Sequence, residues 1–175
     1  MVILETARLI MRDHEPGDLE AYCTMESDAV YRGHQPVHPR DALERSFREV
    51  ALRPRAPGEF RLAATVLKET GAYVGRTGLY PFRDDARGLV PGEAFLAYYI
   101  ARPYWGRGIA TEAAKAWVEY GFRTLTLKRI EAGIAARNVA SLRVAEKAGF
   151  SWLRSGGKPE WPWHDYEIHA PQADP

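Results

Sequence analysis

The sequence predicts an α/β fold in which one mixed sheet carries helices on its faces. Several short strands of antiparallel type come first, and from about residue 93 the chain alternates strand, helix, strand and helix. A length of 175 residues with 46% hydrophobic content suits a single domain over residues 1–175 with its own core. Because ligands of such sheets bind at strand ends, we expect the ligand crevice in the second half of the chain.

The first half contains the expected antiparallel strands and two helices. Asp18 is a plausible N-cap for the first helix, and Gly71 can take a positive φ in a hairpin turn between two strands. The hydrophobic spacing places strands at residues 7–12, 60–68 and 72–80, and helices at residues 19–31 and within 39–52.

The second half shows the alternation of strands and helices more clearly. Residues 93–100 are nearly all apolar, which is typical of a strand buried on both faces. The elements expected after it are a helix at 111–123, a strand at 128–135, a helix at 139–148, and closing strands at 150–154 and 164–170.

Composition and charge exclude several classes of partner. The 24 basic and 23 acidic residues leave a formal net charge of +1, so no broad surface for nucleic acid or anionic membrane is expected. The single cysteine, Cys23, has no disulfide partner and no companions at metal-ligand spacing. No apolar run approaches the ~20 residues of a membrane span. We expect a cytoplasmic protein without a bound metal.

The stretch "WGRGIAT", residues 105–111, lies between an expected strand and an expected helix. A helix N-terminus offers free N–H groups and a positive dipole end, which attract an anion when no side chain blocks its approach. Gly106 and Gly108 remove that obstruction, and Ala110 keeps the first turn small. The stretch therefore suits a pyrophosphate, and an ordinary tight turn is the alternative.

Two other phosphate-binding motifs fit this stretch less well. A P-loop requires Gly-Lys-Ser/Thr after a four-residue gap, which the sequence lacks. A dinucleotide-binding loop requires a third glycine where Thr111 stands, although Glu131 follows at the distance expected of a ribose-binding acid. The loop also comes late in the chain, after antiparallel strands, so a dinucleotide site is disfavoured.

A second helix start favours an anion or cofactor site. In "ARNVASLRVAEKAGF", residues 136–150, Asn138 stands at the N-cap position and Ser141 follows three residues later on the same face. Gly149 is a good helix stop. If the strands before the two helices are neighbours, both helix N-termini open onto the same end of the sheet.

The combination of "LETARLIMR", "YWGRGIATEA" and "RNVASLRVAEKAGF" resembles the GNAT superfamily of N-acetyltransferases. It is most similar to the branch of the RimJ/RimL ribosomal-protein N-terminal acetyltransferases and many small-molecule acetyltransferases. The resemblance covers about Leu4 to Ile168. It implies mostly antiparallel N-terminal strands, a splayed central pair of parallel strands, and direct transfer of an acetyl group from acetyl-CoA to a primary amine.

The resemblance also implies which residues bind the cofactor. Backbone N–H groups of the glycine loop would hold the pyrophosphate of acetyl-CoA, and the strand before it would pair with the pantetheine arm like an added strand. The implied cofactor-binding residues are Tyr99, Ile100, Arg107, Gly108, Ile109, Ala110, Thr111, Asn138, Ser141 and Arg143.

Two catalytic roles are implied as well. Ser141 is the candidate acid for the departing CoA sulfur, although it could simply hydrogen-bond the preceding turn. Relatives of the form "EIGYWL" carry a glutamate as base where this chain has Phe95, so Glu93 on the same strand face is the substitute candidate. Further candidates for the base lie near the C-terminus at Glu160, His164 and Asp165.

Three questions stay open at this level. An acceptor that arrives as a neutral amine would need no strong base. A module that binds CoA without catalysis and an enzyme that binds NAD with the same loop are alternative functions. The acceptor is not identified by the residue types, and the protein could act as a monomer or a homodimer.

Overall fold

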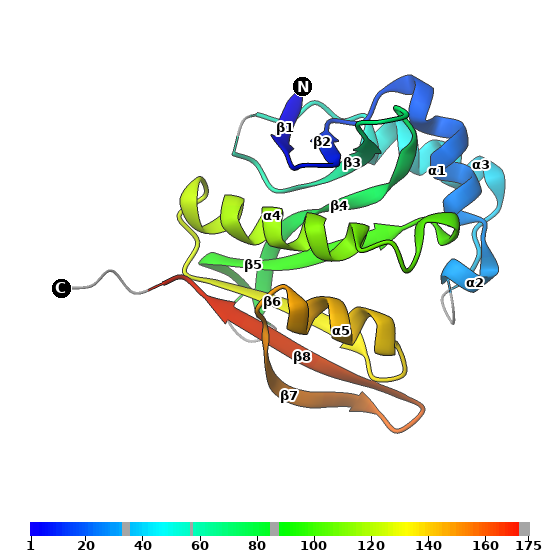
Figure 1. The fold of residues 1–175 in the computed structure, drawn as a ribbon. Helices are drawn as coiled ribbons and strands as arrows, with labels where there is room; N and C mark the ends of the chain where they lie inside the picture. The colour runs from blue at the N-terminus through cyan, green and yellow to red at the C-terminus, as the bar shows by residue number, and fades with distance from the viewer. Residues whose placement is uncertain (33–35, 57, 85–87, 172–175) are drawn as a thin grey trace. The chain divides into compact units, whose positions relative to one another are not determined.

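The computed structural model describes residues 1–32, 36–56, 58–84 and 88–171 (Figure 1). The chain forms two compact units, one of residues 1–77 with 98–110 and one of residues 78–97 with 111–175. Two long strands, β4 (Tyr73–Asp84) and β5 (Gly88–Ile100), contribute residues to both units.

The first unit combines short antiparallel strands with helices. Strand β1 pairs with β2, and β2 pairs with β3, in antiparallel register. A short π-helical segment, Phe47–Ala51, continues the third helix. The elements are β1 (Val2–Glu5), β2 (Leu9–Arg12), α1 (Leu19–Glu26), α2 (Ala29–Arg32), α3 (Arg40–Ser46) and β3 (Arg61–Leu67).

The second unit contains the strand and helix alternation that the sequence predicts. Its elements after β5 are α4 (Ile109–Arg123), β6 (Arg129–Ala135), α5 (Val139–Lys147), β7 (Ser151–Lys158) and β8 (Trp161–His169), with the first two residues of α4 in the first unit. Strand β6 pairs in parallel with β5 and antiparallel with β8. The strand order β1-β2-β3-β4-β5-β6-β8-β7 and the mixed pairing confirm the predicted α/β fold.

One buried cluster of the first unit lies between α1 and α3. Tyr22, Cys23, Leu43 and Phe47 are buried there, and the two helices lie side by side in Figure 1. Burial raises the pKa of the Cys23 thiol, so this cysteine is a small apolar core residue rather than a reactive one.

The core of the second unit depends on close approach of helices to one sheet face. A Cβ at Gly121 of α4 would lie 2.9 Å from the Cδ1 atom of Ile130 on β6, so α4 packs closely against β6 at this point. After α5, Gly149 takes φ +96 and ends the helix as predicted, with Ile168 of β8 packed nearby. Ile130 and Ile168 are register partners, so α4 and α5 cover the same face of this part of the sheet.

The predicted helix at residues 19–31 is wrong in one respect, because it divides into α1 and α2. The carboxylate of Asp28 accepts hydrogen bonds from the backbone N–H groups of Val30 (2.9 Å) and Tyr31 (3.2 Å). Such a side-chain cap satisfies the free donors of a new helix start, so the chain begins α2 there instead of continuing α1.

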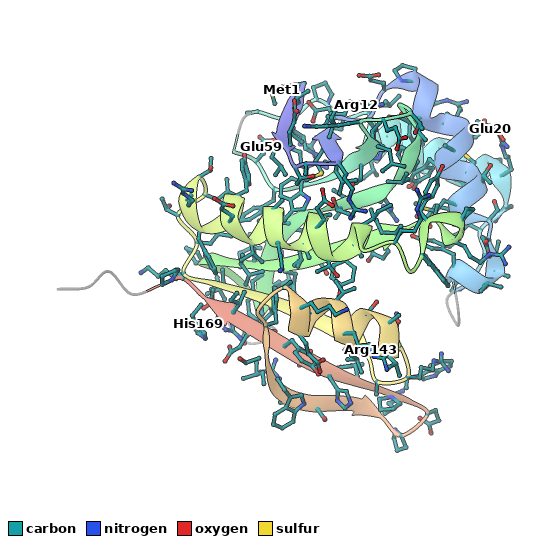
Figure 2. The ribbon with its side chains drawn as sticks, viewed as in Figure 1. Met1, Arg12, Glu20, Glu59, Arg143 and His169 are labelled. Carbon is teal, nitrogen blue, oxygen red and sulfur yellow. The ribbon has the colours of Figure 1, made fainter. Side chains whose placement is uncertain are left out.

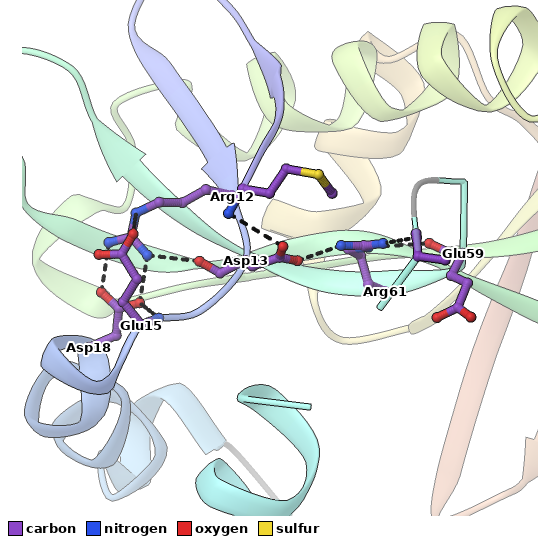
Figure 3. Close-up of polar contacts among 8 residues, drawn as sticks. Arg12, Asp13, Glu15, Asp18, Glu59 and Arg61 are labelled. Atoms are coloured by element: carbon purple, nitrogen blue, oxygen red, sulfur yellow. Dashed lines mark hydrogen bonds and ion pairs between the residues drawn. The ribbon is translucent and has the colours of Figure 1, made fainter. Parts of the chain in front are cut away.

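Asp18 is also not the side-chain cap that the sequence predicts. Its carboxylate accepts two hydrogen bonds from the Arg12 guanidinium, at 2.7 and 2.9 Å, and one from the backbone N–H of Glu15 at 2.8 Å (Figure 3). The same network of charged side chains includes the ion pair between Asp13 and Arg61. The network fixes the segment between β2 and α1, and a bidentate pair of this kind is stronger than a neutral cap.

His14 is a buried titratable group in the first unit. Its ring lies against three aromatic rings, with centroid distances of 6.4 Å to Tyr22, 5.8 Å to Phe47 and 6.0 Å to Tyr73. The Nε2 atom is buried without a hydrogen-bond partner among the described residues. Burial lowers the pKa of His14 to about 4, because the apolar surroundings disfavour the imidazolium.

This burial predicts a loss of stability in acid. The unfolded chain takes up a proton on this histidine near pH 6.5 and the folded chain only near about pH 4, so the contribution of His14 is unaffected above pH 6.5 and falls as the pH drops toward 4. The full loss is roughly 3 kcal/mol. Urea unfolding across this range should show a shallower pH dependence for His14→Phe than for the wild type. Parallel pH profiles would contradict the assignment.

Candidate functional site

The parallel pairing between β5 and β6 is short. It comprises three rungs, Glu93 with Arg129, Ala94 with Ile130 and Phe95 with Glu131. Beyond the last rung β6 continues to Ala135 while paired with β8 on its other side. In the described part of the chain, the β5 side of β6 therefore has free ladder positions after Glu131, which is the splay that the sequence predicts. Backbone groups at such an edge require a partner.

The glycine loop in the first unit is fixed on its N-terminal side. The indole Nε1–H of Trp105 donates a 2.6 Å hydrogen bond to the carbonyl of Ile100. The backbone N–H of Tyr104 bonds the Ala101 carbonyl at 2.9 Å, which forms a 3-10 turn over Arg102–Tyr104. The Arg102 guanidinium pairs with Asp28 at 2.7 Å. These contacts within the protein hold the loop in place.

The two loop glycines take a left-handed backbone conformation. Gly106 has φ +72 and Gly108 has φ +75, a region that costs other residues about 1–2 kcal/mol. Helix α4 begins directly afterwards at Ile109, two residues earlier than expected, and the Ile109 side chain is buried. The first N–H groups of a 15-residue helix thus follow two glycines without side chains.

Two arginines belong to the same loop. The Arg107 guanidinium lies over the Tyr104 ring at 5.5 Å, and the backbone carbonyl of Arg107 accepts a 3.0 Å hydrogen bond from Nη1 of Arg8. Arg8 precedes Arg107 by 99 positions. Sequence reasoning missed Arg8, since no spacing rule connects an arginine in the first turn with a loop so far along the chain.

The backbone N–H and C=O groups of Tyr99 and Ile100 point to opposite sides of β5. A side chain at position 75 of β4 would collide with the carbonyl oxygen of Tyr99, so this oxygen lies against Gly75. Two residues after Tyr99, the N–H of Ala101 also faces β4 and donates a 2.9 Å hydrogen bond to the Val74 carbonyl. Because successive backbone groups of a strand alternate in direction, Ile100 faces away from β4. Ile100 therefore directs its backbone N–H away from β4, while its carbonyl already accepts the Trp105 indole N–H.

The N-terminus of α5 in the second unit is capped as predicted. The Oδ1 atom of Asn138 accepts a 3.1 Å hydrogen bond from the backbone N–H of Ser141, and the Asn138 carbonyl accepts from Leu142 at 3.1 Å. The Ser141 side chain is partly exposed in the first turn. Arg143, labelled in Figure 2, is exposed on the same helix. The cap therefore sets the position of Ser141.

Comparison with known proteins identifies the family. A family model described as "Acetyltransferase (GNAT) domain" matches residues 8–151. The chain belongs to the GNAT acetyltransferases. Among curated relatives, the Bacillus subtilis "Uncharacterized N-acetyltransferase YnaD" is 46% identical over 147 residues, which are 83% of this acetyltransferase and 81% of that protein. The B. subtilis "Probable N-acetyltransferase YjcK" is 42% identical over 80 residues, so that match spans only 44% of either length.

Solved structures show the same fold. A GNAT-family acetyltransferase from Bacillus anthracis superposes with a TM-score of 0.82 at 22% identity, covering 97% of this chain and 98% of that one. The spermidine N-acetyltransferase from Vibrio cholerae, solved with CoA and spermine, superposes with a TM-score of 0.74 at 18% identity, covering 94% and 96%. At these identities the likeness concerns the fold alone.

The candidate bases of this acetyltransferase lie among ion pairs in the second unit. Arg129 donates to Glu93 at 2.6 Å, to Glu167 at 2.6 Å and to Glu131. Phe95 stacks on Phe82 with a 4.7 Å centroid distance, so the position of the family glutamate is filled by an aromatic cluster. The base role of Glu93 stays a prediction, and the Arg129 cluster that holds it was not foreseen from the sequence.

The other candidates for a base are placed as follows. Asp165 is buried and pairs with Arg154 at 2.9 Å. His164 Nδ1 lies 2.7 Å from the Ser155 hydroxyl, and Glu160 is exposed between β7 and β8. These positions make His164 and Glu160 more accessible to an acceptor than Asp165 is.

The structure disfavours the dinucleotide-binding alternative, because its candidate ribose-binding acid, Glu131, is buried. Glu131 is only 1% exposed and pairs with Arg129 and, at 3.7 Å, with Arg154. A carboxylate buried in two ion pairs cannot serve as an exposed ribose ligand without breaking them. Within residues 1–32, 36–56, 58–84 and 88–171, no group of three or more potential ligand side chains is placed to hold a metal.

The predicted site residues fall into two sets. The first unit holds the loop residues Arg107 to Ala110 together with Tyr99 and Ile100, and the second holds Thr111, Asn138, Ser141 and Arg143 with Glu93. Across the residues that the structure describes, no helix has the length and apolar character needed to cross a membrane.

The Asn138 cap predicts a measurable loss of stability. Asn138→Ala should lower the free energy of unfolding by about 1 kcal/mol, because the N–H of Ser141 loses its acceptor. Asn138→Asp is the matched control, since its carboxylate accepts the same bond and also complements the helix dipole. Urea unfolding of both variants checks this. An alanine variant as stable as the wild type would show that the cap contributes nothing.

Proposed function

We propose that this GNAT acetyltransferase transfers the acetyl group of acetyl-CoA directly to a primary amine, on a protein N-terminus or a small molecule. The glycine loop carries the proposal. Gly106 and Gly108, at φ +72 and +75, expose the N–H groups at the start of α4, and the loop is already fixed by its own hydrogen bonds. A preorganised anion cradle of this kind suits the pyrophosphate of CoA.

The donor would be held along its whole length. The N–H groups from Arg107 to Thr111 receive the pyrophosphate, and Ile100, with Tyr99 beside it, pairs with the pantetheine arm as an added strand does. In the second unit, Asn138 contacts the arm and Arg143 reaches a phosphate. The free ladder positions of β6 beyond Glu131 support this reading, because a strand-like ligand would satisfy them.

The chemistry is a single acyl transfer. The neutral amine attacks the thioester carbonyl carbon, the new C–N bond forms, and the C–S bond breaks as the tetrahedral intermediate collapses. Strand N–H groups stabilise the oxyanion. Ser141 supplies a proton to the CoA sulfur, and the amine proton passes to Glu93 or to water. Holding both reactants in one orientation supplies much of the rate enhancement.

The acceptor class and the biological setting complete the proposal. The solved relative bound to CoA and spermine acts on a small polyamine, while the resemblance of the sequence to the RimJ/RimL branch points to protein N-termini. Both are primary amines, and both belong to the proposed range of acceptors. A cytoplasmic location, a single domain over residues 1–175, and action as a monomer or homodimer are further parts of the proposal.

A thermal-shift and turnover experiment tests this function. A ligand at about 100 times its dissociation constant adds about 2.7 kcal/mol of stability, so acetyl-CoA should raise the melting temperature and NAD should not. A panel of polyamines, amino sugars and peptides should then release CoA thiol in the presence of acetyl-CoA. A shift with NAD alone would refute the proposal. Binding of acetyl-CoA without thiol release from any amine would favour a non-catalytic CoA-binding module.

Gly106→Ala should weaken acetyl-CoA binding roughly 5- to 30-fold. A Cβ at φ +72 adds about 1–2 kcal/mol of backbone strain, and the loop relieves this strain by shifting away from the conformation that binds acetyl-CoA. Gly71→Ala is a matched control. Gly71 has φ +70, and a Cβ at either glycine meets nothing within 4 Å. Calorimetry should show equal affinity for the wild type and Gly71→Ala. Equal affinity in Gly106→Ala would remove the loop conformation from the binding argument.

Ser141→Ala tests the proposed acid. The variant should lower kcat about 10- to 100-fold while changing the acetyl-CoA dissociation constant little, because the hydroxyl acts on the departing sulfur. The backbone bond from Ser141 to Asn138 is retained, so the helix start stays intact. Steady-state kinetics with calorimetry separates the two effects. Equal losses in kcat and affinity would make Ser141 a binding residue.

A further inference from the structure

Arg8 reaches the glycine loop from the opposite end of the sequence. Its Nη1 atom donates a 3.0 Å hydrogen bond to the Arg107 carbonyl. Its Nη2 atom would lie 3.5 Å from a Cβ at Gly108, so the guanidinium stands beside the loop glycine. Arg8 is exposed, and all of these atoms belong to the first unit.

The backbone that carries Arg8 is rigid. The turn between β1 and β2 is closed by hydrogen bonds from the Thr6 N–H to the Leu9 carbonyl at 2.9 Å and from the Leu9 N–H to Thr6 Oγ1 at 3.0 Å. The Arg8 carbonyl accepts from the Lys68 N–H at 2.9 Å, and the Leu9 side chain is fully buried. The guanidinium is therefore presented from a fixed base, which lowers the entropy cost of binding a ligand.

The charge around the loop fits a phosphate. Arg8 and Arg107 bring two cations to a loop with two left-handed glycines. The planar fork of a guanidinium also matches phosphate oxygens better than a lysine does.

We propose that Arg8 contacts the pyrophosphate of acetyl-CoA and thereby completes the donor site of the glycine loop. This inference rests on the proposed function. Its rival is a purely structural role, in which Arg8 only ties the β1–β2 turn to the Arg107 carbonyl. The two roles differ in a measurable way, because a phosphate contact matters only for ligands that carry phosphate, and a clamp matters for every ligand of the loop and strand.

Binding of a ligand series by Arg8→Gln and Arg8→Lys tests the assignment. The ligands are CoA, 3′-dephospho-CoA, which keeps the pyrophosphate, and pantetheine, which has no phosphate. We expect Arg8→Gln to weaken CoA and 3′-dephospho-CoA about tenfold each and to leave pantetheine, measured by competition, within about twofold. Arg8→Lys should recover part of the loss. Arg45→Gln is the control, since Arg45 is an exposed arginine on α3 that pairs with Asp41.

The salt dependence of CoA affinity gives a second test. If Arg8 were only a structural clamp, Arg8→Gln would leave this salt dependence unchanged. Between about 50 and 500 mM NaCl, CoA affinity should fall more steeply for the wild type than for Arg8→Gln, because the variant has lost a charge contact that salt screens. Equal losses for all three ligands, unchanged CoA affinity, or a loss for CoA but not for 3′-dephospho-CoA would each overturn the pyrophosphate assignment. A wild type that binds no CoA would instead refute the proposed function.

Discussion

The early end of the β5–β6 ladder is the constraint on which the rest of the candidate site depends. Three parallel rungs stop at Phe95 and Glu131, although β6 continues to Ala135. Buried or half-buried strand edges carry N–H and C=O groups that must find partners. β6 keeps its full antiparallel pairing with β8 over the same residues. Under the proposed function, a strand-like ligand would use the β6 positions after Glu131.

The glycine loop, which carries the proposed anion site, is ordered by a separate set of contacts. The Trp105 indole bonds the Ile100 carbonyl, the 3-10 turn follows, and Gly108 leads directly into α4. The loop thus needs no rearrangement to offer its N–H groups. Because loss of conformational freedom is a main cost of binding, a loop that is already ordered can bind a flexible cofactor with modest contact area.

The sequence predicted those parts of the site that depend on local chemistry. The Asn138 cap and the helix stop at Gly149 each follow from a residue's own side chain or its absence, and the structure confirms both. The strands and helices of the second half were also placed within a few residues, because their hydrophobic periods are strong.

The parts that escaped prediction depend on contacts between distant segments. Arg8 meets the loop across 99 positions, and Arg129 gathers carboxylates from β5, β6 and β8. Asp18 was expected to cap a helix, but the Arg12 guanidinium offers its carboxylate a stronger partner. Local sequence preference predicts the partner of a charged side chain poorly when both a nearby backbone N–H and a distant opposite charge can bind it.

A crystal structure of the complex with CoA would show whether the glycine loop binds the pyrophosphate. We expect pyrophosphate oxygens within hydrogen-bond distance, about 2.7 to 3.2 Å, of the backbone nitrogens between Arg107 and Thr111. CoA bound with its pyrophosphate away from these nitrogens would contradict it.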